Sequence, residues 1–419
     1  DGTDIASAIL ILCFNGMAFG IYCVLCPPFF FFDIIPVKSW LNKMKKMRLH
    51  GILLLLIIIA GCTKVTETEN LYQLPGPTYA GHQFKDKRSV LQIGAALVPY
   101  LGSAGVQALQ LQYGVTVYRV RYQTKNYQGE PLIASGLVYF PDLRYFFVPV
   151  ISYQHGTAIS KGEVPSITAD LDYYVPFVLA SESGAIVCAP DYIGMGFSEG
   201  VHHYFEPTEE ANAVLDLIRS IGDLLKKTYT PLTHNRDVFL MGYSQGGHAT
   251  LAAQKAMETN RWYEYNLKAS APMAGFFSLT SSSQFDVLTD SIDYPFPAVY
   301  PFLINSIQDT RKVFPNNQSI YVSPYDSLSN VLFNGNYNAA YVNAQFPAAV
   351  GKVFQSSFLA QLRNANSAFY KAAASYDVID GWAPSVPTRF YHSEADEVAF
   401  YDNSVIVYQT FKNKGGNVD

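Results

Sequence analysis

The sequence predicts an α/β protein with a mostly parallel central sheet and helices on both faces. From about residue 89 onward, strand-like and helix-like segments alternate, and several of the strand-like segments are short and almost wholly apolar. Hydrophobic residues make up 49% of the 419 residues, which is enough for one large domain with an appended subdomain. The net charge of -5 is spread over intermixed acids and bases, so we expect no nucleic-acid partner.

The first half of this region predicts an antiparallel hairpin followed by two buried strands. Residues 115–122 alternate apolar and polar side chains, residues 132–140 are rich in β-formers, and turn residues lie between them. Residues 148–153 and 185–189 are nearly all apolar, which is typical of central strands covered on both faces. We interpret Cys188, in the second of these runs, as a small buried hydrophobe.

The second half alternates helices with strands and then breaks that rhythm. In order, we predict an amphipathic helix at 207–227, a strand at 237–241, an Ala-rich helix at 246–257 and a strand at 267–274. Residues 278–382 are rich in Phe, Tyr, Asn and Ser and contain several prolines. We interpret them as a helical insertion that caps the sheet, and residues 387–392 as the strand that resumes it.

Ser244 is the candidate nucleophile. Residues Gly242 to Gly246 fit the pattern G-x-S-x-G directly after a predicted strand and before a predicted helix. A reversal from strand to helix at one residue strains the backbone and requires small neighbours, a need that Gly242, Gly246 and Gly247 meet. The helix that begins there points its positive end toward negative charge developing on a substrate. A glycine-rich turn with an incidental serine is the alternative.

Two segments are predicted to supply hydrogen-bond donors for the negative charge that develops on a substrate oxygen. The backbone N–H of Gln245 is the first donor, and the loop after the strand at 148–153 supplies others through Gly156 and the hydroxyl of Thr157. His155 in that loop is interpreted as a positioning residue, because it precedes the nucleophile whereas the base in this kind of site follows the acid. An ordinary glycine turn is the alternative for this loop.

The acid is predicted just past the strand at 387–392. Asp396 is our choice, and Glu394 and Glu397 are its competitors if Asp396 only caps a turn. His248, one helical turn beyond Ser244, is expected to face its helix and not to reach the serine hydroxyl.

No histidine follows Asp396 in the sequence. The eight histidines are His50, His82, His155, His202, His203, His234, His248 and His392. The last residues, 414–419, have the composition of a turn that enters one more strand, after which the catalytic histidine is expected. We therefore expect the sequence to stop before its base, without which activity would fall by orders of magnitude.

Three motifs in this order resemble the secretory lipase group of α/β hydrolases. Along the chain they are Tyr-Gln-His-Gly-Thr at 153–157, Pro-Asp-Tyr-Ile-Gly-Met-Gly at 190–196 and Gly-Tyr-Ser-Gln-Gly-Gly-His-Ala at 242–249. The resemblance covers about residues 89–419. It implies the α/β-hydrolase fold, Ser244 as nucleophile, Asp396 as acid and the insertion at 278–382 as a lid over an acyl pocket. Asp191 and Tyr192 would buttress the site, and we predict neither a metal nor a cofactor.

Residues 1–88 are predicted to direct and tether the protein. Residues 44–62 combine a basic start, an apolar run and a small-residue site, and their end resembles the bacterial lipobox, in which Cys62 is acylated. Residues 63–88 would then be a tether to a bacterial membrane, on its periplasmic side or at the cell surface. Residues 1–43 hold an uncharged run long enough to span a membrane, but we interpret them as upstream translated sequence, because such a helix before a complete lipoprotein signal is redundant.

Three functions compete on these grounds. The leading hypothesis is hydrolysis of a carboxylic ester or lipid through an acyl-enzyme on Ser244. A serine peptidase of the same fold ranks lower, because no added N-terminal domain restricts access. A membrane-tethered binding protein that has lost catalysis is supported only by the absent base, and the gene sequence beyond codon 419 would discriminate it from the enzyme.

Overall fold

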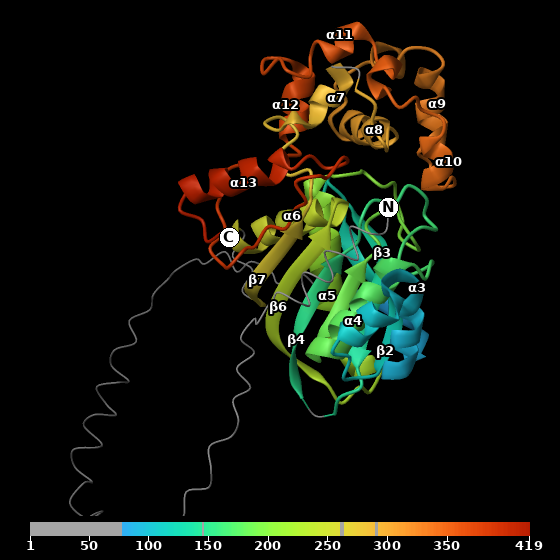
Figure 1. Ribbon diagram of the computed structural model, residues 1–419, viewed down its shortest axis with the longest axis vertical. Helices are drawn as coiled ribbons and strands as arrows, with labels where there is room; N and C mark the ends of the chain where they lie inside the picture. Colours follow the sequence, from blue (N-terminus) through green and yellow to red (C-terminus); the bar gives the residue numbers. More distant parts are fainter. Residues whose placement is uncertain (1–77, 145, 260–263, 290–291) are drawn as a thin grey trace, which may run out of the picture. The chain divides into compact units, whose positions relative to one another are not determined.

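One sheet of seven strands organises the protein (Figure 1). The computed structural model describes residues 78–419 except 145, 260–263 and 290–291, so the predicted signal, Cys62 and the upstream segment lie outside the described residues. The strands are β1 (Tyr79–Arg88), β2 (Val115–Lys125), β3 (Pro131–Pro141), β4 (Phe147–Gln154), β5 (Ile186–Pro190), β6 (Thr233–Tyr243) and β7 (Asn266–Met273). They lie in the order β1-β2-β3-β5-β4-β6-β7.

The sheet is antiparallel at one side and parallel through its centre, as an α/β architecture with an opening hairpin predicts. β2 and β3 form that hairpin in unbroken antiparallel register from Val115 opposite Pro141 to Lys125 opposite Pro131. β5, β4, β6 and β7 then pair in parallel. Because parallel strands share a direction, the loops that follow β4, β6 and β7 meet at one edge of the sheet.

Helices cover both faces, and single strands contribute to both hydrophobic cores. The helices beside the sheet are α3 (Val90–Ala108), α4 (Leu171–Ser183), α5 (Pro207–Lys227), α6 (Gln245–Thr259) and α13 (Asp402–Asn413). In β5, Ile186 and Cys188 pack with α5 while Val187 and Ala189 pack with α3 and α4. This alternation explains the all-apolar run, and burial raises the pKa of the Cys188 thiol to about 12, as expected for a core residue.

The predicted tether extends too far, because residues 79–88 form β1 and pair antiparallel with β2. The segment is rich in polar and charged residues since it is an edge strand with much of its surface exposed, and such strands lack a strong hydrophobic pattern. Ser89 then caps α3, which the sequence analysis did not single out. Among the described residues α3 is the one helix long and apolar enough to cross a membrane, but Ile93 and Leu97 pack against the sheet.

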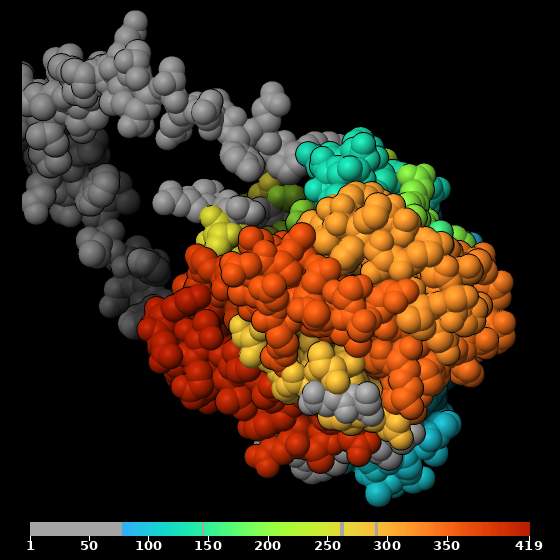
Figure 2. Space-filling model, turned by 90° about the horizontal axis from the view of Figure 1, so that it is seen from above, coloured from blue at the N-terminus to red at the C-terminus, as the bar shows by residue number. Residues whose placement is uncertain are grey.

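The insertion after β7 is helical, as predicted, and its hydrophobic core also includes Ile159, Tyr204, Phe205 and Ala399 from outside it. Its elements are η2 (Ser283–Phe285), α7 (Asp286–Thr289), α8 (Val299–Arg311), η3 (Asn317–Ser319), α9 (Tyr325–Leu332), α10 (Ala339–Asn343), η4 (Val350–Val353), α11 (Ser356–Leu359) and α12 (Ala368–Ala374). We call residues 278–382 the cap. Figure 1 shows its helices gathered beyond one end of the sheet, and in Figure 2 cap residues fill much of the visible face.

The two ends of the cap meet at one buried carboxylate. Asp377 accepts hydrogen bonds from the Ser278 hydroxyl at 3.1 Å, from the Leu279 N–H at 2.6 Å and from the Thr280 hydroxyl. The N–H of Val378 also donates to the carbonyl of Phe277 at 3.1 Å. The chain therefore leaves the sheet and returns to it at nearly the same point.

Two short segments extend the sheet beyond β7. Residues 387–391 lie beside β7, with parallel bridges from Thr388 to Ser270 and from Tyr391 to Met273. Residues 417–419 lie beside them in turn, since Thr388 N–H donates to Asn417 and Phe390 N–H donates to Asp419. The turn predicted near residue 415 thus leads into strand-like pairing.

Candidate active site

Ser244 stands at the reversal between β6 and α6 with a left-handed backbone. Its φ is +57°, a conformation that a serine adopts only when the surrounding structure imposes it. The Ser244 N–H donates to the carbonyl of Met273 at 2.9 Å, and the Ser244 carbonyl accepts from the N–H of Gly247 at 2.9 Å. The residue is therefore held from β7 on one side and from α6 on the other, while its side chain remains partly exposed.

The three glycines around Ser244 are required by close backbone contacts. A Cβ atom on Gly246 would lie 1.9 Å from the carbonyl oxygen of Gln154, and one on Gly247 would lie 2.3 Å from that of Met273. A Cβ on Gly242 would lie 2.4 Å from the carbonyl oxygen of Gly246. Such distances are excluded for any side chain, so α6 starts directly against the ends of β4 and β7.

The loop after β4 lies beside the serine. A Cβ placed on Gly156 would be 4.0 Å from the Cβ of Ser244. The Tyr192 hydroxyl donates to the His155 carbonyl at 2.9 Å, and the Nδ1 atom of His155 lies 2.7 Å from the Gly156 carbonyl oxygen, to which its N–H donates. Because each carbonyl belongs to the same planar unit as the next N–H, these two bonds fix the directions of the Gly156 and Thr157 amides.

The backbone amides of Gly156 and Gln245 are the two predicted oxyanion donors. Within the described residues neither backbone N–H makes a hydrogen bond to protein. Gln245 begins α6, where the first N–H groups have no partner inside the helix. The Thr157 hydroxyl is shared with the Tyr204 hydroxyl at 2.7 Å. The structure thus brings the predicted donors to the same edge of the sheet as Ser244.

Asp191 is buried and holds the loops around the site. It accepts hydrogen bonds from the Ser135 hydroxyl at 2.6 Å and from the Ser166 N–H at 3.2 Å. Burial raises the pKa of the Asp191 carboxyl, although these donors oppose the shift. Its neighbour Tyr192 has a φ of +66° and is the residue that bonds to His155. Tyr192 thus bonds to the loop beside Ser244, and the supporting role of both residues stays a prediction.

The side chain of Gln245 belongs to a buried polar network. Its amide nitrogen donates to Glu210 Oε1 at 3.0 Å and to His202 Nε2 at 3.0 Å. Glu210 Oε2 accepts from His248 Nδ1 at 2.6 Å, and His248 Nε2 donates to the carbonyl of Tyr376 at 2.9 Å. Both ring nitrogens of His248 are therefore engaged away from the serine.

Sequence reasoning missed Glu210 and His202. Glu210 precedes Val214 by four residues and so lies on the apolar face of α5, and an acid on that face was the available signal. His202 lies in a loop, where no periodicity marks it. Burial lowers the pKa of His202 to about 3, so its ring is neutral, with Nδ1–H donating to the Ile193 carbonyl at 3.0 Å.

Asp396 lies in the loop after the strand-like segment at 387–391. Its Oδ1 accepts from the N–H groups of Val398 and Ala399, each at 2.9 Å, and its Oδ2 is 3.5 Å from His392 Nε2. Burial would raise the pKa of Asp396, but the hydrogen bonds from His392 and the two amides outweigh it and lower the pKa. Glu394 and Glu397 are exposed.

Within the described residues no histidine is hydrogen-bonded to Ser244. His392 donates to the Ala399 carbonyl at 2.6 Å and contacts the Ser404 hydroxyl at 2.7 Å. His155 and His202 bond to backbone carbonyls, and His203 bonds to Glu209 at 3.0 Å. The described residues therefore bring the predicted nucleophile and two predicted amide donors together, and no histidine among them is bonded to that serine.

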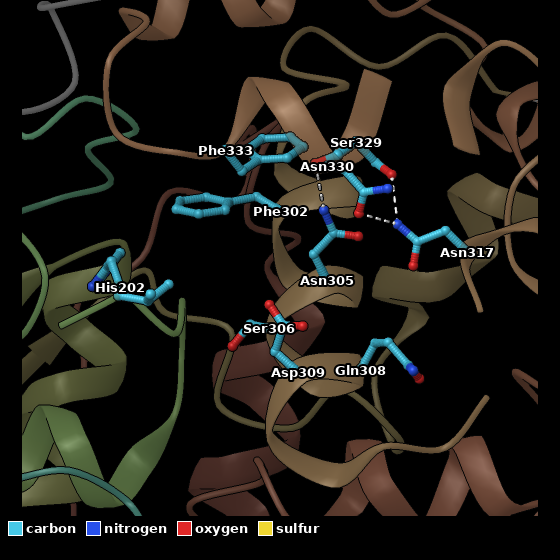
Figure 3. Close-up of a pocket in the computed structure, with 11 residues that line it drawn as sticks. His202, Phe302, Asn305, Ser306, Gln308, Asp309, Asn317, Ser329, Asn330 and Phe333 are labelled. Atoms are coloured by element: carbon cyan, nitrogen blue, oxygen red, sulfur yellow. Dashed lines mark hydrogen bonds between the residues drawn. The ribbon is translucent and has the colours of Figure 1, made fainter. Parts of the chain in front are cut away.

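A polar cavity of about 110 Å³ lies between His202 and the cap (Figure 3). Residues of α8, η3 and α9 form most of its wall, and Phe302 and Phe333 stack with ring centroids 5.0 Å apart at one side. The lining residues are Val201, His202, Phe302, Asn305, Ser306, Gln308, Asp309, Asn317, Ser329, Asn330 and Phe333. Ser244 does not line this cavity. Gln245 is hydrogen-bonded to His202, which does line it.

A strained serine held against two parallel strands is the hallmark of the α/β hydrolases, and the architecture assigns the chain to that class. The sequence profile of the secretory lipase family matches residues 163–419. The chain therefore belongs to the secretory lipase family. Secretion is the location that this family suggests. No curated protein matches the chain.

Solved structures give the same class. The rice cell wall degrading esterase LipA from Xanthomonas oryzae is 25% identical, with a TM-score of 0.69 over 82% of this chain and 89% of LipA. A putative hydrolase from Legionella pneumophila has a TM-score of 0.73 at 21% identity over 81% and 90% of the two chains. Candida antarctica lipase A in its closed state has a TM-score of 0.59 at 18% identity over 82% and 75%. Family and neighbours together support a carboxylic-ester hydrolase of the lipase and esterase kind.

Proposed function

We propose that the protein hydrolyses carboxylic esters, including lipid esters, through an acyl-enzyme on Ser244. The observation that carries this proposal is the left-handed serine at the strand–helix reversal, with a φ of +57°. Glycine would adopt the same φ without strain, so the backbone conformation alone does not call for a serine at this position. A backbone that keeps serine there is typical of a site whose hydroxyl reacts.

Each remaining part of the reaction except the general base has a candidate. The Ser244 hydroxyl would attack the ester carbonyl, and the N–H groups of Gln245 and Gly156 would bind the oxygen that becomes negative. The alcohol would leave, and water would then hydrolyse the acyl-serine. Asp396 would orient the general base through Oδ2, because its Oδ1 is occupied by backbone amides. No histidine among the described residues is hydrogen-bonded to Ser244, so none of them is assigned as the general base.

The Thr157 hydroxyl is proposed as a third donor to the same oxygen. Its bond to Tyr204 is compatible with this role, because a hydroxyl can accept one hydrogen bond and donate another.

Replacement of the nucleophile tests the proposal. The product of the complete gene is assayed with p-nitrophenyl esters and with the matching anilides, and Ser244→Ala is compared with Ser160→Ala, a partly buried loop serine whose hydroxyl donates to the carbonyl of Gly335. We expect Ser244→Ala to lose at least about a thousandfold in rate, whereas Ser160→Ala stays near wild type. A Ser244→Ala protein that keeps its rate would disprove the proposal, and equal turnover of esters and anilides would favour a peptidase.

We also propose that Cys62 carries the membrane anchor of the mature protein. Support comes from the basic, apolar and small-residue order of residues 44–62. Mass spectrometry of the mature N-terminus is the test, with an acylated Cys62 as the expected result. An N-terminus that still includes Asp1 would refute both the anchor and the cleavage.

A further inference from the structure

We infer that Glu210 is a positioning residue for the oxyanion site, acting through the side chain of Gln245. This inference rests on the proposed function, because it concerns how the Gln245 N–H is held beside Ser244. Gln245 follows the nucleophile directly, and its side chain is fully buried. A buried glutamine side chain at this position can fix the first turn of α6 only if its amide is bonded in one orientation.

The surroundings of Gln245 allow one orientation. Glu210 presents a carboxylate oxygen to it, and His202 presents an Nε2 atom that can only accept, since the Nδ1–H of that neutral ring donates to Ile193. Both neighbours are acceptors, so the NH₂ end of the Gln245 amide must face them. The opposite end, Gln245 Oε1, is buried without a hydrogen-bond partner among the described residues. The side chain is therefore held by its two N–H bonds.

Glu210 is the stronger of the two acceptors and is itself held by a second residue of α6. Its side chain is 1% exposed, and His248 on α6 donates to its second oxygen at 2.6 Å. His248 also donates to the Tyr376 carbonyl in the cap. Hydrogen bonds to a charged acceptor in a buried site are stronger than those between neutral groups. Glu210 therefore links α5, the first two turns of α6 and the cap at the residue next to the nucleophile.

Glu209 offers a matched control. It is the adjacent residue on α5, is 3% exposed against 2% for Glu210, and also bonds to a histidine, His203, at 3.0 Å. Its Oε1 atom accepts a hydrogen bond from the N–H of Tyr127 at 3.1 Å. Among the described residues Glu209 makes no hydrogen bond to α6, so its replacement disturbs a similar buried network without a direct effect on Gln245.

The experiment measures kcat and KM on the complete gene product with p-nitrophenyl butyrate, per active site titrated with diethyl p-nitrophenyl phosphate. In Glu210→Gln a neutral carboxamide replaces the carboxylate, and its NH₂ end can donate to Nδ1 of a neutral His248, so the hydrogen bond that holds the Gln245 side chain is weaker. We expect kcat to fall about tenfold to a hundredfold with KM nearly unchanged, as for a misplaced oxyanion donor. Glu209→Gln should change kcat by less than about threefold even where its melting temperature falls equally.

A second variant keeps the inference testable if Glu210→Gln does not fold. Gln245→Met retains the Glu210–His248 pair and the backbone N–H, and we expect it to lose kcat to the same extent. Adding Glu210→Gln to Gln245→Met should then lower kcat no further, because both changes break one connection.

Two results would overturn the inference. One is a Glu210→Gln enzyme whose kcat falls no more than that of Glu209→Gln. The other is a Gln245→Met enzyme with normal kcat. Either result, obtained while Ser244→Ala is inactive, rejects the role of Glu210 and leaves the proposed function in place. An active Ser244→Ala enzyme would instead reject the function itself.

Discussion

Replacing Tyr192 by Phe removes the hydrogen bond that orients the proposed oxyanion loop. The side chain is 1% exposed, and its hydroxyl donates to the His155 carbonyl at 2.9 Å. A buried carbonyl left without its donor costs about 1–3 kcal/mol. If the peptide between His155 and Gly156 rotates to recover this cost, the Gly156 N–H turns away from the substrate oxygen. A loss of 1–3 kcal/mol in transition-state binding corresponds to a roughly 5- to 150-fold lower rate.

The assay is kcat on p-nitrophenyl butyrate between pH 6 and 9. Burial raises the pKa of the Tyr192 hydroxyl well above its ordinary value, so the hydroxyl stays protonated over this range. The ratio of the wild-type kcat to the Tyr192→Phe kcat should therefore not change with pH. Tyr122→Phe is the matched control, since its buried hydroxyl also donates to a backbone carbonyl, that of Ala213, at 2.9 Å. If Tyr192→Phe and Tyr122→Phe lose the same activity, Tyr192 does not orient the loop.

Two further predictions concern stability. Gly246→Ala places a Cβ 1.9 Å from the Gln154 carbonyl oxygen, so we expect the free energy of unfolding in urea to fall by more than about 3 kcal/mol. Gly162→Ala is the control, because the nearest atom to its Cβ would be 3.6 Å away, and it should change the free energy of unfolding by less than about 1 kcal/mol. Asp396 has a lowered pKa in the folded state, so its contribution is present above the unfolded pKa of about 3.9 and is lost as the pH falls through the folded pKa. Asp396→Asn should therefore be less stable than wild type at pH 7, with a difference that shrinks near pH 3, and an equal difference at both pH values would contradict this reasoning.

The elements that sequence predicts well are those whose pattern is set by burial on one side or on both. The helix at Pro207–Lys227 matches its prediction because its apolar spacing and its N-terminal proline act locally. β1 was assigned to the tether because an edge strand needs no apolar alternation, and its pairing with β2 is a long-range contact. Single-sequence patterns carry no information on such pairing.

The candidate site also combines a feature that the local sequence predicts with one that depends on long-range packing. The glycine spacing around Ser244 predicts the reversal, since close backbone approach excludes every other residue at Gly246. The bond from Glu210 to Gln245 joins residues 35 positions apart, and it depends on how α5 packs on α6. Glu209 and Glu210 are both buried, and only the packed structure shows which of the two bonds to α6.

The closed loop at Asp377 makes the cap a replaceable module. Since the chain departs and returns at one buried carboxylate, the strands of the sheet keep their register whatever length or sequence lies between residues 280 and 376. A different cap could then be joined at this point without a change in the strands that hold Ser244, if the Tyr376 carbonyl that His248 contacts is kept. Swapping experiments between related hydrolases should cut the chain at this junction.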